Sequence, residues 1–139
     1  MNGLTIGKVA RGAGLGIETV RFYEREGLLE PPARTEANYR VYPQQDIVRL
    51  RFIKRAKNLG FTLKEIKELL SLRQDPGASK EDVKRQTEAK ISDIDEKIRD
   101  LTRIKQTLEK LDQCCDGHGP TSDCPILEAL ESGHGLELD

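Results

Sequence analysis

All three cysteines of this 139-residue chain lie in one short stretch, CCDGHGPTSDC, at residues 114–124. The same stretch contains His118, one of the two histidines in the chain. Thiolate and imidazole groups are the donors that bind soft and borderline metal ions such as Cu(I) and Zn(II). An odd number of cysteines, two of them adjacent, is a poor basis for a disulfide framework. The stretch therefore predicts either a metal site or a set of reactive thiols.

The composition limits what can surround these cysteines. The chain is 36% hydrophobic and 34% charged, which suits one ordinary domain or a small domain with an extended element. Only 4% of the residues are aromatic, which argues against a large ligand cavity walled by rings. No stretch of the sequence reads as a secretion signal or a membrane span. We expect a cytoplasmic protein with reduced thiols and no membrane partner.

Charge is distributed unevenly along the chain. Residues 1–73 contain 14 Lys and Arg against 8 Asp and Glu, whereas residues 74–139 contain 9 against 16. A basic front half with an acidic back half predicts nucleic-acid contact by the front half alone. The alternative is chance clustering of charges on solvated surfaces.

The front half predicts a helix-turn-helix followed by a small β-hairpin. Thr5 is a candidate N-cap and Gly14 a stop for the first helix, and Gly27 ends the second. The segment EPPARTEANYRVY then breaks the helical pattern and predicts a hairpin with Asn38 near its bend. Such a hairpin forms a wing beside the second helix, which is the element that enters the major groove in helix-turn-helix proteins.

Two further helices complete the predicted head, residues 1–73. Pro43 is predicted in the first turn of the third helix, which Gly60 ends. Thr62 and Glu65 form a capping box for the fourth helix. Lys54 falls in a basic cluster near the end of the third helix. The residues that we expect to contact DNA are Thr19, Arg21, Tyr23, Arg34, Asn38, Tyr39, Arg40 and Arg55.

A linker at residues 74–79 separates this head from one long helix at 80–112. The apolar residues of that helix recur at intervals of 3 and 4, with one slip, which is close to a heptad seam. A helix of about 30 residues has little of its own chain to pack against, so a dimeric coiled coil is expected. Packing back onto the front helices is the alternative. Residues 113–139 form the cysteine loop, a short amphipathic helix and a tail. The seam residues are Ile91, Ile94, Ile98, Leu101, Ile104, Leu108 and Leu111.

Two segments, TVRFYEREGLL and LGFTLKEIKELL, resemble specific signatures of the MerR family of transcription regulators, and the resemblance extends over essentially the whole chain. It implies a mainly α protein with a winged-helix head, an antiparallel coiled-coil homodimer and an effector site at the end of the dimer helix. It also implies binding to a palindromic operator in promoter DNA and distortion of that DNA so that RNA polymerase initiates. No enzymatic activity is implied.

The resemblance also assigns the cysteines. In metal-sensing members, two cysteines that bracket the loop after the dimer helix bind the effector, and Cys115 and Cys124 occupy that position. Cys114 and His118 resemble additional donors of the zinc-responsive branch, for a second ion or a four-ligand site, although His118 is equally a plain exposed residue. His134, in the terminal tail, is expected to be disordered and to take no part.

The start of the long helix departs from the family pattern. Divalent-ion sensors place a cysteine there, contributed by the partner subunit, and copper sensors place a serine. Here Lys80 aligns with that position and Ser79 is its neighbour. A fixed ammonium near a bound ion disfavours a divalent cation more than a monovalent one. Lys80 is therefore a candidate selectivity gate, unless its side chain simply extends into water.

The predicted function is thus a metal-responsive transcription activator. The expected effector is a thiophilic divalent ion of the Zn, Cd, Pb or Hg type. One alternative is a copper-efflux regulator that responds to Cu(I) or Ag(I). Another is a thiol-redox sensor with the same head. A thiol enzyme is disfavoured because no Cys-x-x-Cys motif is present.

Overall fold

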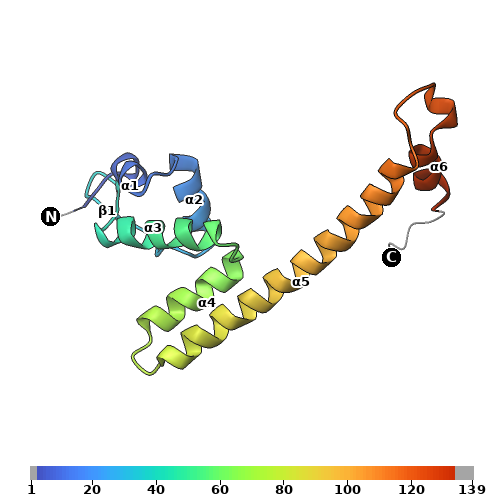
Figure 1. Cartoon of the computed structure of the whole chain (residues 1–139). Coiled ribbons are helices and arrows are strands. Elements are labelled where there is room, and N and C mark those ends of the chain that lie inside the picture. The colour runs from blue at the N-terminus through green and yellow to red at the C-terminus, as the bar shows by residue number, and fades with distance from the viewer. Residues whose placement is uncertain (1–2, 134–139) are drawn as a thin grey trace. The chain divides into compact units, whose positions relative to one another are not determined.

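The structure is a computed structural model of the chain, and it describes residues 3–133. It divides into two compact units, residues 1–84 and residues 85–139, and the division falls inside a helix. We call the described part of the first unit the head. The elements are α1 (Ile6–Ala13), α2 (Ile17–Arg25), β1 (Ala33–Arg34), β2 (Arg40–Val41), α3 (Gln45–Asn58), α4 (Leu63–Gln74), α5 (Lys80–Gln113), the 3₁₀ turn η1 (Thr121–Asp123) and α6 (Pro125–Ser132) (Figure 1).

The helix-turn-helix begins and ends at the predicted signals. The Thr5 hydroxyl accepts a hydrogen bond from the Lys8 amide at 3.3 Å and so caps α1. Gly14 closes α1 with a φ of 70°, a left-handed conformation that glycine adopts without steric cost. The second helix, α2, ends at Arg25, and Gly27 follows with a φ of 80°. These two short helices therefore form the predicted motif.

The predicted hairpin is present as a two-stranded antiparallel wing. Ala33 pairs with Val41 and Arg34 with Arg40. Asn38 turns the chain with a φ of 67°, which asparagine tolerates better than most residues. An isolated bridge between Leu4 and Tyr42 fastens the base of the wing to the start of the head.

The third helix begins later than the sequence predicts. Its first residue is Gln45, so Pro43 precedes the helix and does not lie in its first turn. The Asp46 amide donates to the Pro43 carbonyl at 3.0 Å, so the chain already turns at the proline. The capping box of α4 is confirmed in both directions, since the Glu65 amide donates to the Thr62 hydroxyl at 3.2 Å and the Thr62 amide to the Glu65 carboxylate at 2.8 Å.

One hydrophobic core holds the head together. It takes residues from every helix of the head and from the chain beside the wing, so the core fixes the wing as well as the helices. The largest fully buried side chains are those of Tyr42, Leu28, Leu50, Ile53, Ile66, Val9 and Val20.

The long helix is confirmed at residues 80–113, one residue beyond the predicted end. Six of the seven predicted seam residues are exposed, with exposed fractions from 38% at Ile94 to 64% at Leu101, and Leu111 is half-buried. No helix within residues 3–133 has the length and apolar composition needed to cross a membrane. His134 lies outside the described residues.

Candidate nucleic-acid interface and metal loop

The second helix of the helix-turn-helix presents Arg21 to solvent. Its guanidinium pairs with the Glu18 carboxylate one turn earlier, at 2.8 Å. Both side chains are well exposed, and exposed pairs of this kind contribute little free energy. Arg21 can therefore exchange its partner for a phosphate or a base edge at small cost. Thr19, on the same helix, is half-buried.

Tyr23, a predicted DNA contact, lies mainly in the core of the head. Its side chain lies in the core and is only 7% exposed, three residues after the buried Val20 on the same helical face. Its ring packs against Phe22 with 5.7 Å between the ring centroids. Tyr23 is a core residue because its helical face is the one that α2 buries, and only 7% of the residue is accessible to a ligand such as DNA.

The wing residues are held by local hydrogen bonds. Arg34 donates to the Asn38 carbonyl at 3.1 Å, across the hairpin loop. The Tyr39 amide donates to the Thr35 hydroxyl at 3.1 Å, and the Tyr39 side chain is 72% exposed. The hairpin therefore exposes an aromatic ring and basic side chains on a hydrogen-bonded main chain. Such a surface can contact the phosphates of a nucleic acid.

Arg40, on the second wing strand, contacts an acidic residue that the sequence pattern does not single out. Its guanidinium lies 3.6 Å from the Glu24 carboxylate on α2. The other oxygen of that carboxylate accepts a hydrogen bond from the Tyr42 hydroxyl at 2.7 Å. Burial raises the pKa of Tyr42, and Glu24 raises it further by hydrogen bonding and by its charge. Nothing local in the sequence signals these contacts, because the partners belong to different elements.

Two basic side chains of α3 form hydrogen bonds that stabilise the head. Lys54 donates to the Gly14 carbonyl at 3.0 Å, and Arg51 donates to the Gly12 carbonyl through two nitrogens at 3.0 and 2.7 Å. Both cations thus satisfy carbonyl groups at the C-terminus of α1, where positive charge is favourable. Arg55, the neighbour of Lys54 on α3, is exposed.

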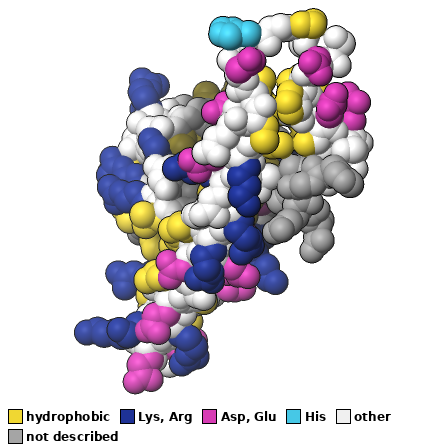
Figure 2. Space-filling model, turned by 45° about the vertical axis from the view of Figure 1, so that its right-hand side comes forward, with side chains coloured by type: hydrophobic (Ala, Val, Ile, Leu, Met, Phe, Trp, Pro, Cys, Tyr) yellow, Lys and Arg dark blue, Asp and Glu magenta, His cyan; other side chains and the backbone are white. Residues whose placement is uncertain are grey.

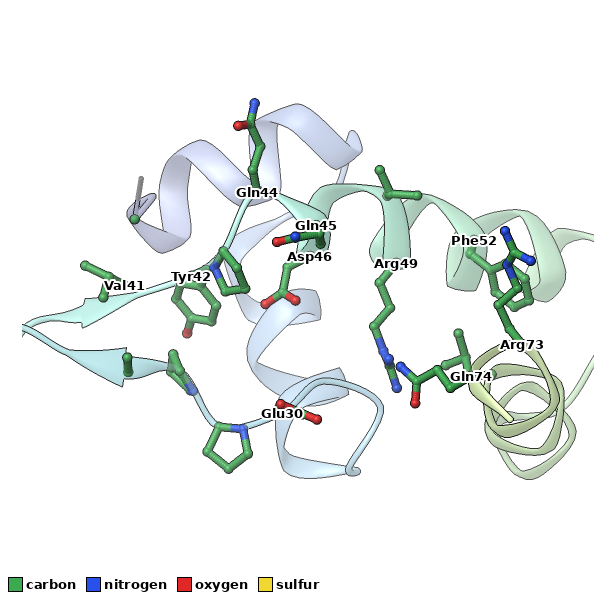
Figure 3. Close-up of a pocket in the computed structure, with 17 residues that line it drawn as sticks. Glu30, Val41, Tyr42, Gln44, Gln45, Asp46, Arg49, Phe52, Arg73 and Gln74 are labelled. Atoms are coloured by element: carbon green, nitrogen blue, oxygen red, sulfur yellow. The ribbon is translucent and has the colours of Figure 1, made fainter. Parts of the chain in front are cut away.

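An open groove of about 1310 Å³ lies between the wing, the start of α3 and the end of α4 (Figure 3). Glu30 and Asp46 face it, together with Arg49. The Arg49 guanidinium donates to the Leu28 carbonyl at 2.7 Å and so holds the segment that follows α2. Burial raises the pKa of Asp46, and the charge of Arg49 partly opposes that rise. Tyr42 and Phe52 are its only aromatic lining residues, so the groove is no ring-walled ligand cavity.

The cysteine loop joins the end of α5 to the start of α6. Cys115 and Cys124 are half-buried, whereas Cys114 is exposed. The Cys115 amide donates to the Asp112 carbonyl, and the Cys124 amide to the Thr121 carbonyl, both at 3.2 Å. Cys124 is the N-cap residue of α6, and its side chain makes no capping hydrogen bond. The loop therefore places its two shielded thiols at its two ends.

The other predicted donors are not gathered with this pair. The His118 amide donates to the Asp116 carboxylate at 2.9 Å, and the histidine side chain is exposed. Nowhere in residues 3–133 do three His, Cys, Asp or Glu side chains come together closely enough to hold an ion. The four-ligand set of Cys114, Cys115, His118 and Cys124 is thus not assembled in this conformation.

The surroundings of the loop suit a cation. Residues 111–133 contain Asp and Glu but no Lys or Arg. In Figure 2 the side chains around the loop are hydrophobic, acidic or histidine, and no Lys or Arg is seen among them. Two thiols in such surroundings fit a soft or borderline metal ion by their chemistry.

The residues at the start of α5 have separate roles. Ser79 caps the helix, since the Asp82 amide donates to its hydroxyl at 3.4 Å and its own amide donates to the Asp82 carboxylate at 2.9 Å. Lys80 follows as the first residue of α5 and is exposed. The Ser79 hydroxyl is therefore engaged in capping, whereas the Lys80 side chain is exposed to solvent.

Comparisons with known proteins agree with these features. The sequence matches the description "MerR HTH family regulatory protein" over residues 4–72 and "MerR, DNA binding" over residues 47–111. The mercuric resistance operon regulatory protein of Bacillus cereus is 46% identical over 125 residues, which cover 90% of this chain and 95% of that protein.

Two solved structures resemble the whole chain. The transcription regulator PbrR691 from Ralstonia metallidurans CH34, in complex with lead(II), has a TM-score of 0.83 and 37% identity, over 91% of this chain and 98% of its own. MerR from Bacillus megaterium MB1, in complex with mercury(II), has a TM-score of 0.71 and 40% identity, over 92% of this chain and 99% of its own.

Proposed function

The chain belongs to the MerR family of helix-turn-helix regulatory proteins, and we propose that it regulates transcription in response to a thiophilic metal ion bound by Cys115 and Cys124. The observation that carries this proposal is the pair of half-buried thiols at the two ends of the loop between α5 and α6. Two similar proteins, 37% and 40% identical over more than 90% of this chain, were solved in complex with lead(II) and mercury(II), which supports a metal of that class.

The head supplies the DNA contacts in this proposal. A palindromic operator is bound by two copies, one head on each half-site. The exposed seam of α5 supports a homodimer, because a second copy in an antiparallel coiled coil would bury it. Distortion of the promoter, recognised by RNA polymerase, is the proposed output. The proposed contacts are Thr19, Arg21, Tyr23, Arg34, Asn38, Tyr39, Arg40 and Arg55.

A bound metal ion would link the two thiolates. Cys115 holds the end that follows α5, and Cys124 holds the end that begins α6. The glycines between them permit the loop to adjust, since Gly117 and Gly119 have φ angles of 79° and 99°. The free energy available for switching is the difference in metal affinity between two conformations of the protein.

The charge near the thiols bears on which metal is bound. Two thiolates with a divalent ion are neutral, whereas two thiolates with Cu(I) carry one negative charge that an ammonium would offset. The absence of Lys and Arg from residues 111–133 gives the loop no cation of its own, so Lys80 is the candidate gate if a partner subunit places it near the ion. We propose a divalent ion of the Zn, Cd, Pb or Hg type, with Cu(I) or Ag(I) as the alternative.

An anaerobic competition titration tests the metal assignment. Reduced protein is titrated with Zn(II), Cd(II), Pb(II), Hg(II) and Cu(I), and affinity and ions per chain are recorded. Preference for a divalent ion in wild type, with little change in Lys80→Cys, supports the loop as the complete site. Preference for Cu(I), with divalent binding gained in Lys80→Cys and not in the matched variant Lys97→Cys, supports the copper alternative.

Serine variants test the ligand pair. Cys115→Ser and Cys124→Ser should each weaken metal binding by about 100-fold or more, because a hydroxyl is a poor ligand for a soft ion. Cys114→Ser is the matched control, since that thiol is exposed. Full metal affinity in either Cys115→Ser or Cys124→Ser would contradict the proposed pair.

The redox alternative uses the same thiols and is separated by reagents. A metal response is lost when a chelator is added and survives mild reductant. A response that survives the chelator but disappears with reductant would identify a thiol-redox sensor instead.

A further inference from the structure

One carboxylate joins the second helix of the helix-turn-helix to the wing. Glu24 uses both oxygens, one for the Tyr42 hydroxyl at 2.7 Å and the other for the Arg40 guanidinium at 3.6 Å. The Glu24 side chain is only 16% exposed, and Tyr42 is fully buried. The Arg40 side chain is 42% exposed, so only the carboxylate end of the ion pair lies in poorly solvated surroundings. A carboxylate that is mostly buried and hydrogen-bonded keeps its own position better than an exposed one.

The base of the wing has a second anchor beside this one. The Leu4 amide donates to the Tyr42 carbonyl, and the Tyr42 amide to the Leu4 carbonyl, both at 2.8 Å. The backbone at Tyr42 is therefore fixed without Glu24. The Arg40 guanidinium, by contrast, is held by side chains: the Glu24 carboxylate lies 3.6 Å away, and Arg40 also lies close enough to the Tyr42 hydroxyl to lower the pKa of that group. Removal of the Glu24 charge would release that guanidinium while the strand stays in place.

The negative charge of Glu24 cannot by itself favour DNA binding. Glu24 lines a hollow of about 310 Å³ with Ile6 and three arginines, Arg21, Arg25 and Arg40. A negative charge there repels a phosphate, so simple electrostatics predicts tighter DNA binding when the charge is removed. A carboxylate on this surface aids DNA binding only if it directs the cations around it.

We propose that Glu24 is a positioning residue for DNA binding, which fixes the Arg40 guanidinium relative to α2 so that Arg21 and Arg40 meet the duplex in one set geometry. The inference rests on the proposed contact between Arg40 and DNA. It adds a residue that does not itself touch the duplex but decides whether the wing and the helix contact it together.

The experiment measures DNA affinity by fluorescence anisotropy with two labelled duplexes. One is selected from a random-sequence library by the wild-type chain, and the other is a scrambled duplex of the same composition. Glu24→Gln keeps an oxygen for the Tyr42 hydroxyl but removes the charge that holds Arg40. Glu26→Gln, an exposed neighbour, is the control for removal of one negative charge.

The expected result has opposite signs in the two variants. Glu24→Gln weakens binding to the selected duplex by about tenfold, the size expected when one arginine contact to the duplex is lost. Glu26→Gln leaves it unchanged or slightly tighter. In Glu24→Gln, the slope of log K against log salt falls by about 0.9 for each phosphate that is no longer neutralised. The scrambled duplex separates these specific effects from general charge attraction.

A double-mutant cycle with Arg40→Ala assigns the effect. The combined variant should bind about as weakly as Arg40→Ala alone, because Glu24 acts through Arg40. Active fractions are determined by stoichiometric titration, so that a variant that folds poorly is not scored as a weak binder.

Three results would overturn the inference. They are unchanged or tighter binding of the selected duplex by Glu24→Gln, additive effects in the cycle, and an Arg40→Ala variant that binds normally. Failure of the proposed metal function is seen separately, as an absence of metal binding by wild type. Glu24→Gln should bind metal with the stoichiometry of wild type.

Discussion

The head and the second unit treat their hydrophobic residues in opposite ways. The head buries Val9, Leu50, Ile66 and their neighbours in a single core. Across residues 85–133, no hydrophobic side chain is buried, and the α5 seam is exposed except at the half-buried Leu111. The head therefore completes its own core, whereas the second unit has an apolar surface that only another surface can cover.

The functional groups follow the same contrast. In the head, Arg34 and Arg40 are already fixed by Asn38 and Glu24. In the loop, the two half-buried thiols lie at opposite ends of a segment whose glycines permit movement. The difference suggests that a DNA surface can be built by one folded head, while an effector site must be able to change when its ligand binds.

The largest expected effect comes from a charge in the seam. Ile98→Asp should weaken a homodimer by more than about 4 kcal/mol, or about 1,000-fold, because each copy would bury an unpaired carboxylate. Sedimentation equilibrium measures the change. Gln106→Asp adds the same charge away from the seam and should leave the association unchanged. Equal behaviour of the two variants would exclude the seam as the interface.

A core substitution in the head should cost nearly as much but affect only the head. Leu50→Ala removes a fully buried side chain and should lower the free energy of unfolding by about 3 kcal/mol. All three tyrosines lie in the head, so tyrosine fluorescence in urea reports its unfolding. The matched Leu108→Ala, on the exposed seam, should leave that transition in place. A comparable destabilisation by both would remove the contrast between the units.

Arg21→Ala tests the DNA surface alone. It should weaken binding to the selected duplex by about 30-fold, with or without metal, because a base or phosphate contact by arginine is worth about 2 kcal/mol. Arg73→Ala, an exposed arginine at the end of α4, is the control. Normal affinity of Arg21→Ala would remove this residue from the interface.

The smallest expected effect concerns the pH dependence of Tyr42. Below pH 10 its hydroxyl donates to Glu24, so Tyr42→Phe should be about 1.5 kcal/mol less stable than wild type. The folded-state pKa of Tyr42 is raised above 10.0, so its contribution is fully present below pH 10 and is lost as pH rises through the folded pKa. Wild type should therefore approach Tyr42→Phe in stability above pH 10. Urea unfolding from about pH 8 to about pH 11.5 measures this, and a constant difference would contradict it.

Features that depend on residues close together in the chain could be predicted from the sequence. Thr5, Gly14 and the Thr62–Glu65 capping box fix helix ends through hydrogen bonds or backbone angles within a few residues. The seam of α5 and the crowding of all the cysteines into one loop are also visible as spacing alone. The family resemblance rests on such local patterns, and the comparisons confirm it.

Contacts between residues far apart in the sequence could be identified only from the folded structure. In the structure Tyr23 lies in the core, and Lys54 donates a hydrogen bond to the Gly14 carbonyl. Glu24 contacts both Arg40 and Tyr42. A residue type on a helix does not reveal which long-range partner it meets, because burial and pairing depend on how the elements pack. The donors of the metal loop show the same limit, since residues close in sequence are not thereby gathered around one point in space.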